Sequence, residues 1–303
     1  MCGDGCYGRR ESRTKHARKR LVTVDWLSQN LRRKDLVIVD ASWHLGDRSG
    51  SQDFEKQHIP GAVFFDLDEV CAKDTDLPHM MPTAQVFTEW LRTHVGGDAS
   101  HKTFVIYDTV GIFSAARAWW MFEAFGLQAC VLDGGLPAWN ERHLQCQSGA
   151  SSLKTLPLDT TLIPNPRHRV VSMAEVSANL TTRDFVVVDA RPAGRFNGTA
   201  KEPRPIPSGH MPGSVNVPSS TLVRGGCMLP SQELVEVFTA AGLQLSGGQR
   251  HVVSCGSGVT ACIVAFALQL VDAPCDGLYD GSWAEWAAHA VNPIEPKRET
   301  LAM

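Results

Sequence analysis

One cysteine lies in a loop whose neighbours could stabilise a sulfur anion. The loop "CGSGVT" (255–260) stands between a short apolar run, typical of a buried strand, and the longer run Val259–Val271, typical of a buried helix. Gly256 and Gly258 allow a sharp turn, so that successive peptide N–H groups can point inward as a nest. The N-terminal end of the following helix adds partial positive charge. The pattern predicts that Cys255 is a nucleophile whose sulfur is held as a thiolate or persulfide anion.

The same cysteine could instead be an inert core residue, because free cysteines are among the most buried residue types. Cys262 lies seven positions further along the same helix face and is predicted to pack in the core. The nine cysteines are an odd number and widely scattered, which argues against a disulfide framework. Only Cys2 and Cys6 approach a metal-ligand spacing, as a weak C-x3-C pattern. We therefore expect a reduced, intracellular chain without a bound metal.

The elements that would position this cysteine occur twice along the chain. Apolar runs closed by an aspartate predict buried parallel strands, and a His-x-Pro-Gly turn enters the next strand in each half. The matching segments, in order, are "DLVIVDASW" (35–43) and "DFVVVDARP" (184–192), "HIPGAVFFDLD" (58–68) and "HMPGSVNVPSS" (210–220), "TFVIYD" (103–108) and "HVVSC" (251–255), and "VLDGGLPAW" (131–139) and "GLYDGSWAEW" (277–286).

The register of this repeat places a different residue at the end of the third strand in each half. The first half has Asp108 there and the second half has Cys255. The next landmark aspartate, Asp133 or Asp280, follows 25 residues later in both. A duplicated scaffold that keeps its thiol only once is expected to have one chemical centre, beyond the carboxyl ends of the strands.

Strands that alternate with helical stretches predict an α/β fold with two similar domains, each a mainly parallel sheet with helices on both faces. The expected helices that follow the third strands are Ser114–Phe125 and Val259–Val271. Residues 21–145 are assigned to a first domain, 146–167 to a linker rich in Ser, Thr and Pro, and 168–303 to a second domain.

The charge of the chain is unevenly distributed. The net charge is −3, but residues 1–20 carry seven Lys or Arg against two acidic residues, a local +5 that leaves −8 for the remainder. This extension is predicted to be disordered, because it has few apolar residues; a nucleic-acid arm or an organelle transit peptide are the alternatives. No apolar run reaches the length of about 18 residues that a membrane span needs. We expect a cytoplasmic protein, or a mitochondrial one if residues 1–20 are a targeting segment.

Several of these segments resemble the two-domain rhodanese family. The motifs that carry the resemblance are "HIPGA", "HMPGS", "FSAARAWW", "EPRP", "CGSGVT" and "YDGSWAEW", and the similarity covers about residues 21–296. Within the family the resemblance is closest to the sulfurtransferases that use 3-mercaptopyruvate. It implies a catalytic second domain, a non-catalytic first domain and an active site between them. Related phosphatases of the same fold have C-x5-R, whereas the sixth position after Cys255 is Ala261, so phosphate-ester hydrolysis is disfavoured.

The resemblance also implies roles for individual residues. Arg195 in "GRF" and Arg204 in "EPRP" match the arginines that bind the substrate, and Ser257 matches a Ser-His-Asp arrangement with His79 and Asp68. These arginines could instead form structural salt bridges, and His79 could be a satisfied loop histidine. The remaining loop residues, expected to line the substrate site, are Gly256, Gly258, Val259 and Thr260. Arg191, His58 and His210 are expected to be structural.

The activity implied is transfer of sulfur from 3-mercaptopyruvate, through a Cys255 persulfide, to thioredoxin, a small thiol or cyanide, with release of pyruvate. This chemistry needs no metal or organic cofactor, and no nucleic-acid or membrane partner is expected. The neutral Gly256 and Ser257 favour a monoanionic keto acid over the dianion thiosulfate. Thiosulfate:cyanide sulfur transfer remains an alternative, as does a non-catalytic rhodanese module that binds partners.

Overall fold

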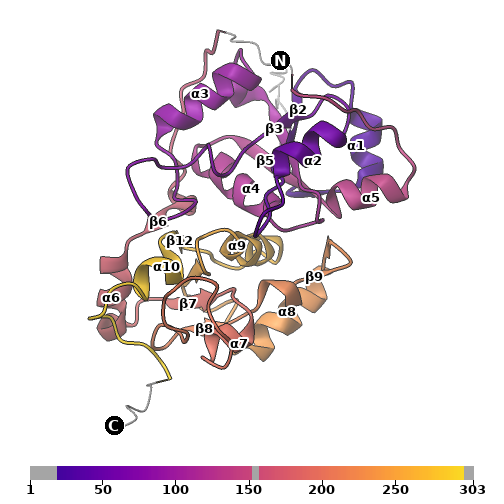
Figure 1. Ribbon diagram of the computed structural model, residues 1–303. Coiled ribbons are helices and arrows are strands. Elements are labelled where there is room, and N and C mark those ends of the chain that lie inside the picture. Colours follow the sequence, from indigo (N-terminus) through magenta and orange to yellow (C-terminus); the bar gives the residue numbers. More distant parts are fainter. Residues whose placement is uncertain (1–18, 152–156, 297–303) are drawn as a thin grey trace, which may run out of the picture.

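The computed structural model describes residues 19–151 and 157–296. These residues form two halves of similar architecture that pack against each other (Figure 1). Residues 1–18, most of the expected basic extension, and 152–156 of the expected linker lie outside the described residues. Within the described ranges, no helix combines the length and the apolar character that crossing a membrane requires.

The first half is built on a parallel sheet of five strands within residues 19–151, in the order β1-β5-β4-β2-β3. Helices α1, α2 and α5 pack on one face of the sheet, and α3 and α4 pack on the other. The elements are β1 (Leu21–Val22), α1 (Val24–Asn30), β2 (Leu36–Asp40), α2 (Gly50–Lys56), β3 (Val63–Phe64), α3 (Ala84–His94), the 3-10 helix η1 (Ala99–His101), β4 (Thr103–Tyr107), α4 (Ala115–Ala124), β5 (Gln128–Leu132) and α5 (Gly135–Glu141).

The second half repeats this plan within residues 157–296, with the strand order β6-β12-β11-β7-β8. An antiparallel hairpin, β9 with β10, is added to it. The elements are η2 (Pro166–His168), β6 (Val170–Val171), α6 (Met173–Thr182), β7 (Val186–Asp189), α7 (Ala193–Phe196), β8 (Val215–Asn216), η3 (Ser219–Thr221), β9 (Val223–Arg224), β10 (Cys227–Met228), α8 (Ser231–Ala240), β11 (His251–Ser254), α9 (Ala261–Leu270), β12 (Gly277–Tyr279) and α10 (Ser282–Trp286).

The two strand orders are equivalent element for element, which confirms the predicted α/β fold with a duplicated parallel sheet. Alternate residues of each central strand face opposite layers, because side chains in a strand point to opposite faces. Val252 packs with α6 and α10, whereas its neighbour Val253 packs with α8 and α9. The central strands β4 and β11 are therefore buried on both sides, and apolar residues form their middle positions.

The halves share one hydrophobic core. Helix α9 lies against α4 at the seam between them (Figure 1), and a single cluster of buried residues extends through both. Trp119 of α4 packs edge-on against Phe266 of α9, with ring centroids 4.8 Å apart. Because burying apolar area stabilises the fold roughly in proportion to that area, this contact fixes the relative position of the two sheets.

The repeated His-Pro-Gly turns are structural in both halves. The ring of His58 stacks on Phe54 with centroids 4.0 Å apart, and its Nδ1 lies 2.7 Å from the carbonyl oxygen of Phe54. His210 stacks in the same way on Phe196 at 3.8 Å, and its Nδ1 lies 2.9 Å from the carbonyl oxygen of that residue. Each turn is thereby fastened to the helix that precedes it.

Candidate active site

The cysteine loop follows β11 and needs both of its glycines, for different reasons. Gly258 has a φ of +78°, and a Cβ there would lie 2.6 Å from Oδ1 of Asp280. Gly256 has an ordinary φ, but a Cβ on it would lie 3.1 Å from Nη2 of Arg195. A side chain at position 258 is excluded by conformation and space, and one at position 256 would crowd the arginine.

The turn before α10 holds the start of the loop in place. The backbone N–H of Cys255 donates to Oγ of Ser282 at 3.1 Å. The carbonyl oxygens of Cys255 and Gly256 accept from the N–H groups of Trp283 and Ala284, each at 3.0 Å. The thiol-bearing residue is thus fixed at both of its peptide groups, and only 2 % of it is exposed.

The equivalent loop of the first half shows what such a turn binds. The buried carboxylate of Asp108 accepts four backbone N–H groups at 2.8–2.9 Å, those of Val110, Gly111, Phe113 and Ala115. This loop is a nest that is occupied by its own anion.

In the second half, the residues equivalent to Val110, Gly111 and Phe113 are Ser257, Gly258 and Thr260. Their backbone N–H groups form no hydrogen bond with any described residue. The same turn is therefore open around Cys255, where the first half has filled it with a carboxylate. Thr260 is the N-cap residue of α9, and the carbonyl oxygen of Val259 accepts from the N–H of Cys262 at 3.2 Å.

Side chains of the first half reach this loop and form a chain of contacts with it. His79 Nδ1 lies 3.2 Å from Oγ of Ser257, and His79 Nε2 lies 3.0 Å from Oδ1 of Asp68. The indole N–H of Trp43 donates to the other oxygen of Asp68 at 3.0 Å, and its ring meets the imidazole edge-on at 4.6 Å. The structure thus brings the three residues expected for a Ser-His-Asp arrangement together.

The charge relations within this chain of contacts favour an ionised Asp68. Its hydrogen bond with His79 lowers the pKa of Asp68, and this outweighs the opposing effect of partial burial. His79 is itself 7 % exposed and has a φ of +61°. A non-glycine residue rarely adopts that conformation, so surrounding contacts must hold it there.

The two arginines that are expected to bind the substrate both lie beside the cysteine loop, but within the described ranges only one of them is ion-paired. Arg195 donates from Nε and Nη2 to Glu202 at 3.0 and 2.5 Å, so part of its guanidinium is already paired. Arg204 Nη1 would lie 3.6 Å from a Cβ on Gly256, and its side chain forms no hydrogen bond or ion pair with any described residue. Arg204 is therefore the free cation of the site among the described residues.

Arg191 is structural, as the sequence predicted. It is 1 % exposed, and its guanidinium contacts Asp189 at 2.6 Å and Glu202 at 2.8 Å. It also lies over the ring of Trp283, 4.3 Å from the centroid. Through Glu202, Arg191 helps to orient the carboxylate that pairs with Arg195.

Arg117 of α4 was not singled out by sequence reasoning, yet it joins the two halves at this site. It is fully buried and forms an ion pair of 2.7 Å with Asp280. It also donates to the carbonyl oxygens of His79 and Gly258. Burial opposes its charge, but Asp280 and Cys262 together outweigh this and raise the pKa of Arg117. Its place as the one charged residue of the motif "FSAARAWW" was the available signal.

This geometry defines a class of protein: two rhodanese-like halves, one of which has an open anion nest around a cysteine. The family model described as "Rhodanese-like domain" matches residues 23–142 and again 172–289. The chain belongs to this family, as the resemblance of its motifs indicated.

Individual relatives are similar over most of their length. The 3-mercaptopyruvate sulfurtransferase of Escherichia coli is 39% identical over 280 residues, which cover 91% of this chain and 97% of the relative. The mitochondrial thiosulfate/3-mercaptopyruvate sulfurtransferase 1 of Arabidopsis thaliana is 39% identical over 301 residues, covering 91% and 78%. The crystal structure of SseA from Escherichia coli, reported for the rhodanese fold of 3-mercaptopyruvate sulfotransferases, superimposes with a TM-score of 0.77 at 36% identity, covering 88% of this chain and 99% of that one.

Proposed function

We propose that this protein is a sulfurtransferase that takes sulfur from 3-mercaptopyruvate onto Cys255 and passes it to a thiol or to cyanide. The observation that carries the proposal is the open nest around Cys255, whose counterpart in the first half holds a carboxylate with four N–H groups. A persulfide sulfur carries a negative charge, as that carboxylate does, so the unpaired N–H groups of the loop can donate hydrogen bonds to it. The similarity to 3-mercaptopyruvate sulfurtransferases supports the choice of donor.

In the first half-reaction the Cys255 thiolate attacks the sulfur of the donor. The new S–S bond forms as the C–S bond breaks, and the electron pair leaves with pyruvate as its enolate. Protonation of the enolate carbon gives pyruvate. Because Cys255 is 2 % exposed, the persulfide is screened from bulk water until an acceptor arrives.

The proton movements fall to the chain Ser257–His79–Asp68 in this proposal. Its support is the pair of contacts of 3.2 and 3.0 Å that place the imidazole between a hydroxyl and a carboxylate. Asp68 orients the ring and stabilises its charged form, as the carboxylate of a triad does. Ser257 is adjacent to the nest, so a proton can be delivered next to the reacting sulfur.

The arginines and the loop would bind the keto acid. Arg204 offers a free guanidinium, which suits the carboxylate of a bound donor. Arg195 is held by Glu202 through Nε and Nη2, so it would bind the donor through Nη1 and the second hydrogen of Nη2, which lies beside Gly256. The remaining lining of the donor site is proposed to be Gly258, Val259 and Thr260.

In the second half-reaction a thiolate or cyanide attacks the outer sulfur, and the Cys255 thiolate leaves. Thioredoxin, a small thiol and cyanide are the proposed acceptors. We further propose a cytoplasmic location, with a mitochondrial one as the alternative because a relative of this chain is mitochondrial.

Mass spectrometry tests the proposal directly. Incubating the full chain with 3-mercaptopyruvate and no acceptor should add about 32 Da at Cys255 and release one pyruvate per chain. Cys255→Ser should give neither product, whereas Cys71→Ser, which changes a thiol outside the loop, should give both. Sulfur that is loaded only from thiosulfate would favour the alternative donor. No loading from either donor would favour a non-catalytic binding module.

A further inference from the structure

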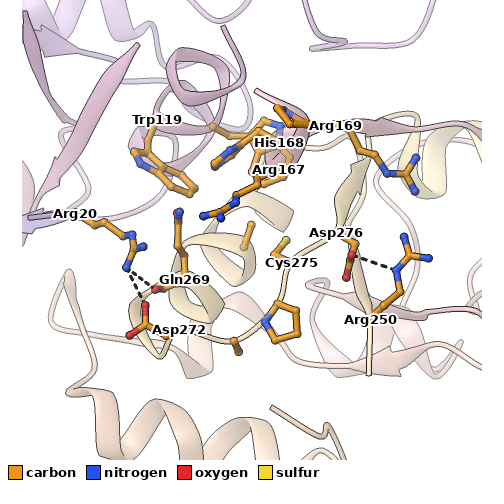
Figure 2. Close-up of a pocket in the computed structure, with 15 residues that line it drawn as sticks. Arg20, Trp119, Arg167, His168, Arg169, Arg250, Gln269, Asp272, Cys275 and Asp276 are labelled. Carbon is orange, nitrogen blue, oxygen red and sulfur yellow. Dashed lines mark hydrogen bonds and ion pairs between the residues drawn. The ribbon is translucent and has the colours of Figure 1, made fainter. Parts of the chain in front are cut away.

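A cavity lies at the seam of the two halves, away from the cysteine loop. Its volume is about 530 Å³. It is lined by the last turns of α9 and the segment that follows, whereas the cysteine loop precedes α9. The first half contributes Arg20 with Trp119 and Trp120 of α4. The remaining lining comes from the segment 166–169, from Arg250, and from residues between 265 and 276. None of the proposed active-site residues lines it (Figure 2).

The cavity carries an excess of positive charge. Four arginines line it, Arg20, Arg167, Arg169 and Arg250, against the two aspartates Asp272 and Asp276. Figure 2 shows Arg20, Arg167 and Gln269 on the side of Trp119, and Arg250 with Asp276 and Cys275 on the other side.

The four arginines differ in how far they are neutralised. Arg20 pairs with Asp272 at 3.2 Å and Arg250 with Asp276 at 3.1 Å. Arg169 pairs at 2.6 Å with Glu175, outside the lining. The guanidinium of Arg167 is exposed and forms no ion pair or hydrogen bond with any described residue. The cavity therefore retains an unpaired guanidinium.

The aromatic wall of the cavity contains donors that lack acceptors. Trp119 and Trp120 are each 1 % exposed, and neither indole N–H has a hydrogen-bond partner among the described residues. The imidazole of His168 meets both rings edge-on, with centroids 5.3 and 4.6 Å away. Because both N–H groups lie beneath the surface of the cavity, they cannot reach a ligand in it, and recognition of a ligand has to come from the arginines.

We propose that this cavity binds a small phosphate-bearing anion, held by Arg167 with Arg20 and Arg250 around it. Guanidinium groups match phosphate oxygens in geometry and charge. The volume is within the range of small-molecule pockets, about 300–1,000 Å³, and exceeds what a single inorganic phosphate needs. Since the lining comes from both halves, the ligand would bind across the seam.

Calorimetric titration of the full-length protein tests this site, with ADP and inorganic pyrophosphate as separate probes at matched ionic strength. Saturable binding at one site per chain is expected. Comparable affinity for both probes assigns the recognition to the phosphate groups, whereas tighter binding of ADP shows that the nucleoside also contacts the cavity. Arg167→Ala should weaken binding at least tenfold, because it removes the unpaired cation without breaking an ion pair. Arg32→Ala changes an exposed arginine outside the cavity and should leave the affinity unchanged.

The outcome is separable from that of the proposed sulfur transfer. The titration is repeated with Cys255→Ser, which cannot form a persulfide and should bind both probes like the unchanged protein. A ligand that binds the native state also raises the temperature of thermal unfolding as its concentration rises. Binding that never saturates, or binding that Arg167→Ala leaves intact, would overturn the proposal.

Discussion

The buried cysteines of this fold have different backbone surroundings. Burial raises the pKa of Cys130 to about 12. Burial also raises the pKa of Cys262, although Arg117 lies beside it and acts in the opposite direction. Both thiols stay protonated and inert. Cys255 is just as buried, but its loop offers N–H groups without partners. Local backbone geometry, rather than exposure, distinguishes Cys255, the proposed nucleophile, from these two thiols.

The free guanidinium of Arg204 provides a test at a single residue. Arg204→Lys keeps the charge but loses the planar fork, so kcat/KM for 3-mercaptopyruvate should fall by roughly 10-fold or more. Steady-state pyruvate release measures this. The control is Lys201→Ala, which removes an exposed cation nearby and should change little. Equal kcat/KM values for Arg204→Lys and the unchanged protein would remove Arg204 from the donor site.

The loop that follows β4 in the first half is built around the carboxylate of Asp108. Asp108→Ala would leave four buried N–H groups without their carboxylate. An unsatisfied buried donor costs about 1–3 kcal/mol, and water entering the vacated nest offsets part of this, so the free energy of unfolding should fall by about 2–4 kcal/mol in total. Urea denaturation measures it.

The control for this substitution is Asp74→Ala, which removes an exposed carboxylate of the same half. It should change the free energy of unfolding by less than about 0.5 kcal/mol, as surface substitutions usually do. If both variants were equally stable, the carboxylate of Asp108 would not be what holds the turn, and the analogy with the open nest at Cys255 would weaken.

Sequence reasoning predicted these elements well where periodicity and repetition were present. The central strands β4 and β11 and the helices α4 and α9 occur at the expected places, because apolar runs of that length leave few alternatives. The edge strands β1 and β6 were not predicted. Each has only two residues, which is too short for a pattern, and pairing with the neighbouring strand defines them.

The candidate site was predictable in part. The duplicated register identified Cys255 against Asp108, but it could not show that Asp108 fills its own nest. His79 and Ser257 are 178 positions apart, so their contact came from the family resemblance and not from spacing. The pair Arg117–Asp280 joins elements of different halves, and no local signal reports such a contact.

The free energy of unfolding of the whole molecule should depend on pH through His168, which lies at the seam between the halves. Burial, with Arg167 and Arg20 nearby, lowers the pKa of His168 from 6.5 to about 4. Below pH 6.5 the unfolded chain binds a proton there and the folded chain does not, so stability is complete above pH 6.5 and is lost as pH falls towards 4. Between pH 7.5 and 5 this histidine should account for about 2 kcal/mol of lost stability.

The measurement is urea unfolding at those two pH values. His168→Gln cannot titrate but keeps an acceptor for the amide of Asn165, which lies 3.1 Å from His168 Nδ1. Between pH 7.5 and 5 its free energy of unfolding should fall by about 2 kcal/mol less than that of the unchanged protein. His101→Gln replaces an exposed histidine and should follow the unchanged protein. Identical pH profiles for all three proteins would contradict the assignment.

The pair Arg117–Asp280 couples the assembly of the two halves to the geometry of the site. Arg117→Met leaves Asp280 buried without its cation, which typically costs about 3–5 kcal/mol, and removes the donor to the carbonyl oxygens of His79 and Gly258. Both the free energy of unfolding and kcat should fall.

The double variant Arg117→Met/Asp280→Asn separates the two effects. Removing the unpaired charge should restore part of the stability, since a buried pair can often be replaced as a unit. It should not restore kcat, because the peptide groups of His79 and Gly258 still lack the guanidinium that orients them. The free energy of unfolding from denaturation and kcat from steady-state kinetics, measured on both variants, separate the two effects. A double variant with full activity would mean that the ion pair holds the halves together but does not position the reacting groups.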